Sequence, residues 1–129
     1  MSKSRENFEF TAFAAAARGA TTNRGDLENR TGRGVRLWLN ITAASGSTPT
    51  LDIKLQWKDP VSGLYFDIPG ANFPQKPAAG TDDLTVYPGI AETATEAVSD
   101  VIPRNWRAVA TIGGTTPSFT FSLGGSYIV

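Results

Sequence analysis

The sequence predicts an all-β protein, an antiparallel β-sandwich of about 7–8 strands with an extended N-terminal arm. Two segments alternate strictly between apolar and polar residues, which is the period of a strand with one buried face. Gly- and Pro-rich turn sequences separate the strand-like segments at intervals of roughly 8–15 residues. Helical periodicity is poor. Only "AETATEAVSD" favours a helix, and nearby prolines limit the length of a helix there.

The clearest strands lie at residues 35–42 and 51–58. Their inward positions are Val35, Leu37, Leu39 and Ile41 in the first, and Leu51, Ile53, Leu55 and Trp57 in the second. The sequence "ASGSTP" between them is a turn cluster. Residues 59–63, "DPVSG", then predict a hairpin loop that leads into "LYFDI".

The second half of the chain predicts fewer and shorter strands before a long β-rich end. Residues 69–83 contain three prolines and read as a surface loop, and "LTVY" is a strand that stops at Pro88-Gly89. Residues 105–112 and 118–129 are strands, and "GGTTP" between them is expected to be a hairpin loop. The alternation also places Val86, Trp106, Ala108, Ile112, Phe119, Phe121 and Leu123 in the core.

The N-terminal residues 1–33 differ from the domain at residues 34–129. Phe8, Phe10 and Phe13 can enter a sheet, but the four alanines that follow offer little area to bury. Arg18, Arg24 and Arg30 lie in a polar stretch that keeps only one large apolar residue. We expect this segment to be an arm that reaches a partner, through main-chain pairing and arginine–carboxylate contacts.

Residues 88–104 form an excursion between two strands and consist mainly of small, acidic and turn-forming residues. Small side chains let the backbone approach a neighbouring surface closely. Ile90 and Glu92 are therefore candidate contact residues of a loop at the rim of the sandwich. A plain crossover connection explains the same composition, and the residues alone leave both readings open.

The composition excludes most catalytic chemistry. The chain of 129 residues contains no His and no Cys, so it lacks the usual zinc ligands, the histidine base, the thiol nucleophile and disulfides. Lys plus Arg equals Asp plus Glu at 12 each, which provides no overall field for nucleic acid. The start lacks a secretory pattern, and no apolar run is long enough for a membrane span. We expect no enzyme, no cofactor and no metal, and a protein made in a cytoplasm.

Trp38 lies in the outward register of its strand, between Leu37 and Leu39. An outward Trp predicts a covering partner, and a protein surface is the commonest cover. A carbohydrate-binding adhesin domain is an alternative, in which Trp38, Tyr65, Phe66 or Tyr87 would stack against sugars.

Four blocks, "RGVRLWLNITA", "KDPVSGLYFDI", "LTVYPGIAETA" and "VIPRNWRAVAT", resemble in order and spacing a family of small structural proteins of tailed bacteriophages and prophages. The resemblance runs from about Gly19 to the end of the chain. The matching residues are structural, namely Asp59-Pro60, Pro88-Gly89 and Pro103-Arg104, and the family brings no catalytic residues.

This resemblance implies a component of the virion, assembled in the cytoplasm of the host bacterium. Within it we expect a capsid decoration, or cement, protein on the capsid surface, whose partners are the major capsid protein and other copies of this chain. A neck or tail structural protein is the alternative within the same class. The candidate partner-binding residues are Phe8, Phe10, Phe13, Arg18, Arg24, Arg30, Trp38, Ile90 and Glu92.

Overall fold

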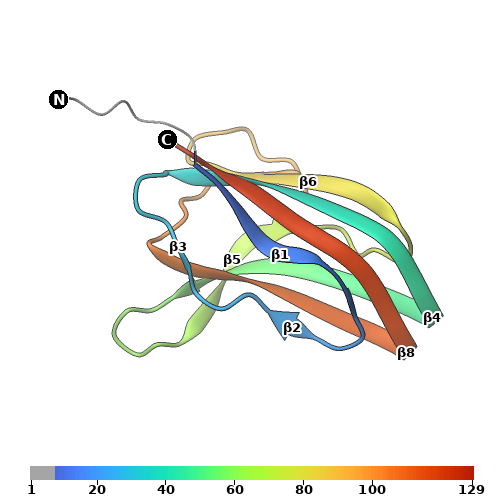
Figure 1. Ribbon diagram of the computed structural model, residues 1–129. Helices are drawn as coiled ribbons and strands as arrows, with labels where there is room; N and C mark the ends of the chain where they lie inside the picture. Colours follow the sequence, from blue (N-terminus) through green and yellow to red (C-terminus); the bar gives the residue numbers. More distant parts are fainter. Residues whose placement is uncertain (1–7) are drawn as a thin grey trace.

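The computed structural model describes residues 8–129, which form eight strands and no helix (Figure 1). The predicted all-β class is confirmed. Every strand pair is antiparallel except the short parallel contact of β6 with β7. Among the described residues there is no helix of the length and apolarity that a membrane span needs. The strands are β1 (Phe8–Arg18), β2 (Thr22–Asn23), β3 (Leu27–Glu28), β4 (Gly34–Lys58), β5 (Tyr65–Asn72), β6 (Gly80–Val86), β7 (Ala97–Val98) and β8 (Asn105–Ile128).

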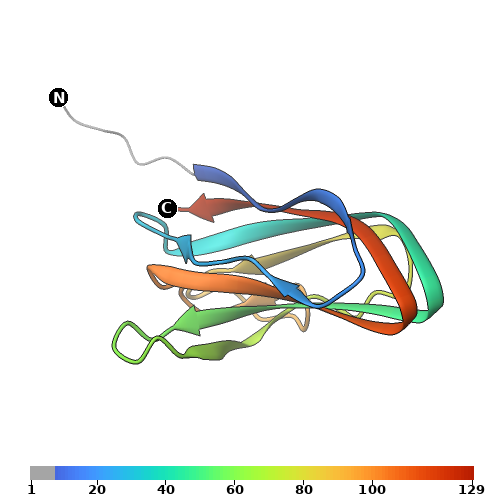
Figure 2. The same ribbon diagram turned by 60° about the horizontal axis from the view of Figure 1, so that its bottom comes forward.

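The two long strands β4 and β8 pair with each other over most of their length and fold back together. Residues 34–45 of β4 pair with residues 118–128 of β8, and residues 50–57 pair with residues 106–113. The sheet is therefore doubled into two layers that are continuous along one edge, at the right of Figure 2. The first layer also contains β1, β6 and β7, and the second also contains β2, β3 and β5.

The fold-back occurs at two matching sequences, Gly46-Ser47-Thr48-Pro49 in β4 and Gly114-Thr115-Thr116-Pro117 in β8. In each sequence the Gly has a φ above +100° and the Thr before the Pro also has a positive φ: 110° and 47° in β4, 113° and 44° in β8. The hairpin loop expected at "GGTTP" is therefore wrong, and the turn cluster "ASGSTP" lies inside β4. Each is a bend inside one strand, and the strand arms on either side pair with the other long strand.

The two bends lie against each other. A Cβ at Gly46 would lie 2.7 Å from the carbonyl oxygen of Thr116, and a Cβ at Gly114 would lie 2.8 Å from the carbonyl oxygen of Thr48. Real Cβ atoms do not approach backbone oxygens so closely. Glycine is thus required at both positions for two reasons. A side chain would clash with the opposite bend, and the φ angle is positive.

The core lies between the two layers and confirms the predicted apolar alternation. Of the expected core residues all are buried except Trp57, which is partly exposed. Trp106 in the second layer donates an indole hydrogen bond to the Tyr127 hydroxyl in the first layer, at 3.1 Å. The ring of Phe10 in β1 meets Trp106 edge to face, with centroids 5.8 Å apart. These aromatic contacts tie the layers together.

Three strands of the expected arm, β1, β2 and β3, pair with β8 and so belong to the sheet. β1 pairs with β8 from Phe8 opposite Tyr127 to Arg18 opposite Phe119, with two register shifts on the way. Ala12 and Phe13 are buried. Phe10 and Phe13 anchor β1 before the four alanines, and Arg18 lies over the Phe121 ring after them, so the alanines need little area of their own. Residues 1–7 of the expected arm lie outside the described residues.

The excursion at residues 88–104 connects the first layer to the second and covers the core on the way. Val98 in β7 and Ile102 are buried in it. The Ile102 amide donates a hydrogen bond to the Arg33 carbonyl, at 3.1 Å. The connection is therefore part of the packed structure, and contact through Ile90 and Glu92 stays a prediction.

A buried asparagine fastens the end of this connection. The Asn29 side chain is 6% exposed. Its amide nitrogen donates to the carbonyls of Gly32 and Ile102, both at 2.8 Å, and its oxygen accepts from the Gly32 amide at 2.8 Å. Its polar atoms all have partners, so hydrogen bonds offset its desolvation while it links the turn before β4 to the turn before β8.

We predict that Gly46→Ala and Gly114→Ala each destabilise the protein by roughly 2–4 kcal/mol, from backbone strain together with overpacking against the opposite bend. Chemical denaturation measures the loss. Gly25→Ala is the matched control, because a Cβ there meets nothing within 4 Å. Equal stability of Gly46→Ala and Gly25→Ala would contradict the interlocked bends.

Candidate functional site

Large apolar side chains that are exposed gather at one end of the molecule. Five of the six such residues in the described chain lie at the end opposite the bends, which we call the hairpin end because it includes the β4–β5 hairpin. β4 runs from its bend to this hairpin, and Phe8 lies opposite Tyr127 at the far end of the first layer. The six are Phe8 (63% exposed), Val61 (94%), Leu64 (61%), Phe66 (52%), Val101 (50%) and, away from that end, Trp38 (45%).

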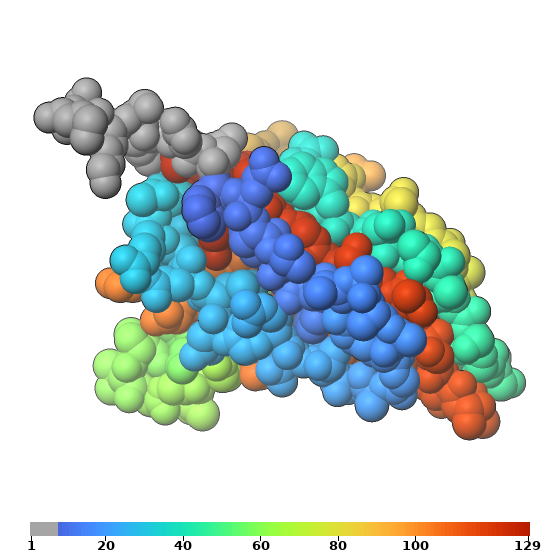
Figure 3. Space-filling model, viewed as in Figure 1, coloured from blue at the N-terminus to red at the C-terminus, as the bar shows by residue number. Residues whose placement is uncertain are grey.

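The β4–β5 hairpin forms a projection there, light green at the lower left of Figure 3. Its turn is held by Asp59, whose carboxylate accepts hydrogen bonds from the Val61 amide at 3.0 Å and the Ser62 hydroxyl at 2.6 Å. The Asp59 backbone also bonds to Gly63 and Leu64, at 2.9 and 2.8 Å. The turn is therefore ordered by its own polar atoms, while Val61 and Leu64 face solvent.

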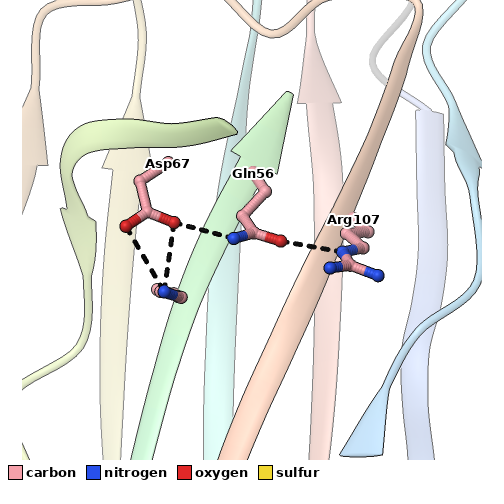
Figure 4. Close-up of polar contacts among 4 residues, drawn as sticks. Gln56, Asp67 and Arg107 are labelled. Atoms are coloured by element: carbon pink, nitrogen blue, oxygen red, sulfur yellow. Dashed lines mark hydrogen bonds and ion pairs between the residues drawn. The ribbon is translucent and has the colours of Figure 1, made fainter. Parts of the chain in front are cut away.

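A row of polar side chains ties the hairpin to the rest of the second layer (Figure 4). Arg107 of β8 donates to the Gln56 oxygen of β4 at 2.8 Å, and Gln56 donates to the Asp67 carboxylate of β5 at 2.8 Å. Lys54 forms an ion pair with Asp67 at 3.1 Å. The hydrogen bonds from Gln56 and then Lys54 hold the pKa of Asp67 below its ordinary value. The row links β5 to β8 across β4.

A second group fixes the base of the hairpin to the segment before β3. The Lys58 ammonium lies 2.6 Å from the Asp26 carboxylate, and the Tyr65 hydroxyl donates to the same carboxylate. The Arg107 guanidinium stacks over the Tyr65 ring, 3.6 Å from its centroid. The hydrogen bonds from Lys58 and Tyr65 hold the pKa of Asp26 below its ordinary value, and the bond to Asp26 raises the pKa of Tyr65. Four side chains therefore fix the hairpin base.

Phe66 extends the apolar surface from the hairpin toward the turn before β8. It lies directly across from Trp57, so their side chains share one face of the sheet. The Trp57 indole nitrogen in turn lies 3.5 Å from the carbonyl oxygen of Val101. Phe66, Trp57 and the Val101 backbone therefore lie next to one another beside the projecting hairpin.

Arg18, one of the predicted partner-binding residues, is half-buried and bonds within the fold, and its contact with a partner stays a prediction. Its guanidinium donates to the carbonyls of Ala14 at 2.7 Å, Ala16 at 3.2 Å and Phe121 at 3.0 Å. It also lies over the rings of Phe121 and Phe13, at 4.6 and 5.1 Å from their centroids. Arg18 thus satisfies carbonyls where the register shifts of β1 interrupt regular pairing.

The other predicted site residues are scattered. Phe13 is buried and Phe10 is partly buried against the core, so both serve the fold, and contact of either with a partner stays a prediction. Arg24 pairs through its backbone amide with Ala108, and Arg30 forms an ion pair with Glu28. Phe8 and Arg30 are exposed at the hairpin end, Ile90 is half-buried, Glu92 is exposed, and Trp38 is exposed on the outer face of the first layer.

Sequence reasoning missed Val61, Leu64 and Val101 as surface candidates. The signal was present in "DPVSGLYF", where two bulky apolar residues flank a Ser-Gly pair inside a turn. A turn normally carries polar residues, so apolar ones at its tip are a better indication of contact than the arginines of the N-terminal segment.

Within residues 8–129 no three His, Cys, Asp or Glu side chains are grouped as ligands of a metal ion would be. Comparison of the chain with protein-family models, with curated proteins and with solved structures found no match.

We predict that the ordered turn is acid-labile. The hydrogen bonds from Ser62 and Val61 hold the pKa of Asp59 below its ordinary value of 3.8. Because the pKa of the folded Asp59 carboxyl is depressed, the ionised carboxylate stabilises the turn above pH 3.8. This contribution is lost as the pH falls through the folded pKa. NMR titration of the Val61 amide shift should show a midpoint below 3.8.

Asp59→Asn is the control for this titration and should abolish the transition while leaving the rest of the spectrum unchanged. A midpoint at or above 3.8 in the unmodified protein would contradict the hydrogen-bonded turn.

Proposed function

We propose that the protein is a non-enzymatic structural component of a tailed-bacteriophage or prophage particle, a capsid decoration protein that binds the major capsid protein through its hairpin end. The observation that carries the proposal is the gathering of five exposed apolar side chains at that end, on an ordered hairpin. The resemblance of the four sequence blocks supports the phage assignment. In this proposal the protein assembles in the host cytoplasm and resides on the capsid surface.

The energetics favour a protein partner for this surface. Burial of one exposed Val, Leu or Phe side chain stabilises a complex by about 1.5–3 kcal/mol. The hairpin is already held by Asp59, Asp26 and Arg107, so little conformational entropy is lost when a partner binds. A rigid apolar projection of this kind is suited to a groove in a neighbouring protein.

A role at the neck or tail would use the same surface against another structural protein. The two placements differ only in which protein binds. The binding test below therefore uses capsid shells as the proposed partner and tail preparations as the comparison.

We predict that Val61→Ser combined with Leu64→Ser weakens binding to shells lacking this protein by tenfold or more, because loss of about 1.4 kcal/mol of apolar burial already gives a factor of ten. Co-sedimentation of shells with increasing protein measures the affinity. Thermal melting should be close to that of the unmodified protein, since neither side chain is buried.

Trp38→Ser is the matched control, because it removes an exposed apolar side chain from outside the hairpin end. Shell binding that persists in the double variant but is lost in Trp38→Ser would overturn the proposed surface. Binding of the unmodified protein to tails and not to shells would place it at the tail instead.

A further inference from the structure

The outer face of the first layer carries a hollow that the proposed docking surface does not include. It is lined by Trp38, Leu39, Asn40, Thr81, Asp82 and Asp83. Trp38 is the one large exposed apolar residue in the described chain that lies away from the hairpin end. We propose that this hollow binds a neutral carbohydrate, one hexose unit of an oligo- or polysaccharide stacked against Trp38.

The indole is left clear because its cross-strand neighbours are short. Trp38 lies opposite Gly124 of β8 on one side and Asp83 of β6 on the other. A Cβ at Gly124 would have only the Phe10 carbonyl oxygen within 4 Å, at 3.9 Å. Ser122 and Ser126, the next residues of β8 on the same face as Gly124, are small as well. No bulky side chain of β8 therefore covers the ring.

The rim of the hollow supplies groups that match sugar hydroxyls. The side chains of Asn40 and Thr81 make no hydrogen bond within residues 8–129, although they pair across neighbouring strands. The amide offers both donors and an acceptor, and the hydroxyl offers one of each. Two free, bifunctional groups beside an aromatic ring can fix the orientation of a polyhydroxylated ligand.

The two carboxylates of the rim are already held in place. Asp82 pairs with Lys76 at 2.9 Å and accepts from the Asp83 amide at 2.9 Å. Asp83 forms an ion pair with Arg36. Each carboxylate has several acceptor sites, so sites remain for sugar hydroxyl donors. Lys76 and Arg36 are each paired with one of these carboxylates, so the rim offers no unpaired cation to an anionic sugar, and the proposed ligand is therefore neutral.

The surroundings favour a sugar over a protein. A protein interface needs a broad apolar centre, whereas Trp38 is the one large exposed apolar side chain here, among Ser, Thr, Asn, Asp and Arg36 side chains. A pyranose needs only one aromatic surface for its C–H face and polar groups around it. Among the other aromatic candidates, Tyr65 is excluded because Arg107 covers its ring and Asp26 accepts from its hydroxyl.

The test is a printed array of oligosaccharides of glucose, galactose, mannose and N-acetylglucosamine, with uronic-acid oligosaccharides as charged counterparts. The array is followed by titration of any bound oligosaccharide against the full chain, observed through the Trp indole NMR signals. We expect a neutral oligosaccharide to bind and to shift the Trp38 indole signal. Uronic-acid oligosaccharides should bind at least tenfold more weakly.

Two variants locate the site. Trp38→Ala should abolish binding, and Gly124→Val should weaken it at least tenfold by covering the ring, since Gly124 has room for a side chain. Phe66→Ala is the matched control, an exposed aromatic on another surface, and should bind as the unmodified protein does. Circular dichroism checks that each variant is folded. If Gly124→Val is unfolded, the result for Trp38→Ala decides the test.

Three results would overturn the proposal. These are no binding of any neutral oligosaccharide up to millimolar concentrations, binding that survives Trp38→Ala, or binding confined to the uronic-acid series. None of them bears on shell binding through the hairpin end, which is measured separately.

Discussion

The reciprocal contact of the bends at Gly46 and Gly114 is the constraint on which the rest of the structure depends. Each glycine lies against the backbone of the other bend, at a distance that leaves no room for a side chain. β4 and β8 can therefore fold back together and remain paired on both sides of the bend. Only then do the layers face each other, with Trp106 of one bonded to Tyr127 of the other. A shift of either bend would break both the pairing and the core.

The same constraint gives the molecule two unlike ends. The doubled edge closes one end, so the connections of β4 to β5, of β3 to β4 and of the excursion to β8 lie at the other. Loops carry function when a rigid scaffold positions them. Here the scaffold is the pair of long strands, and the Asp59 turn and the Arg107 row extend its rigidity into the hairpin. The exposed apolar side chains of the hairpin end are presented by ordered backbone.

Local alternation predicted much of this fold, because a strand with one buried face has an apolar residue at every second position, as at Leu37 and Leu39. It did not predict the bends, since Gly, Ser, Thr and Pro favour a hairpin turn and a bend within a strand equally. Only the contact between residues 46–49 and 114–117, far apart in sequence, decides between them. The contacts of Arg18 were not predicted for the same reason, because its carbonyl partner on Phe121 is distant in the chain. Recognising the β4–β5 hairpin as a candidate surface required the exposed fractions of its side chains, which composition alone does not give.

We propose that the hairpin end faces the shell, and the orientation of the protein on the particle tests this proposal most directly. Cryo-electron microscopy of purified particles, at a resolution that separates strands, would give this orientation. The account predicts that density for the β4–β5 hairpin contacts the capsid protein, with the bends at residues 46–49 and 114–117 pointing away from the shell. Density in which the bends or the Trp38 face contact the capsid, while the hairpin points to solvent, would contradict it.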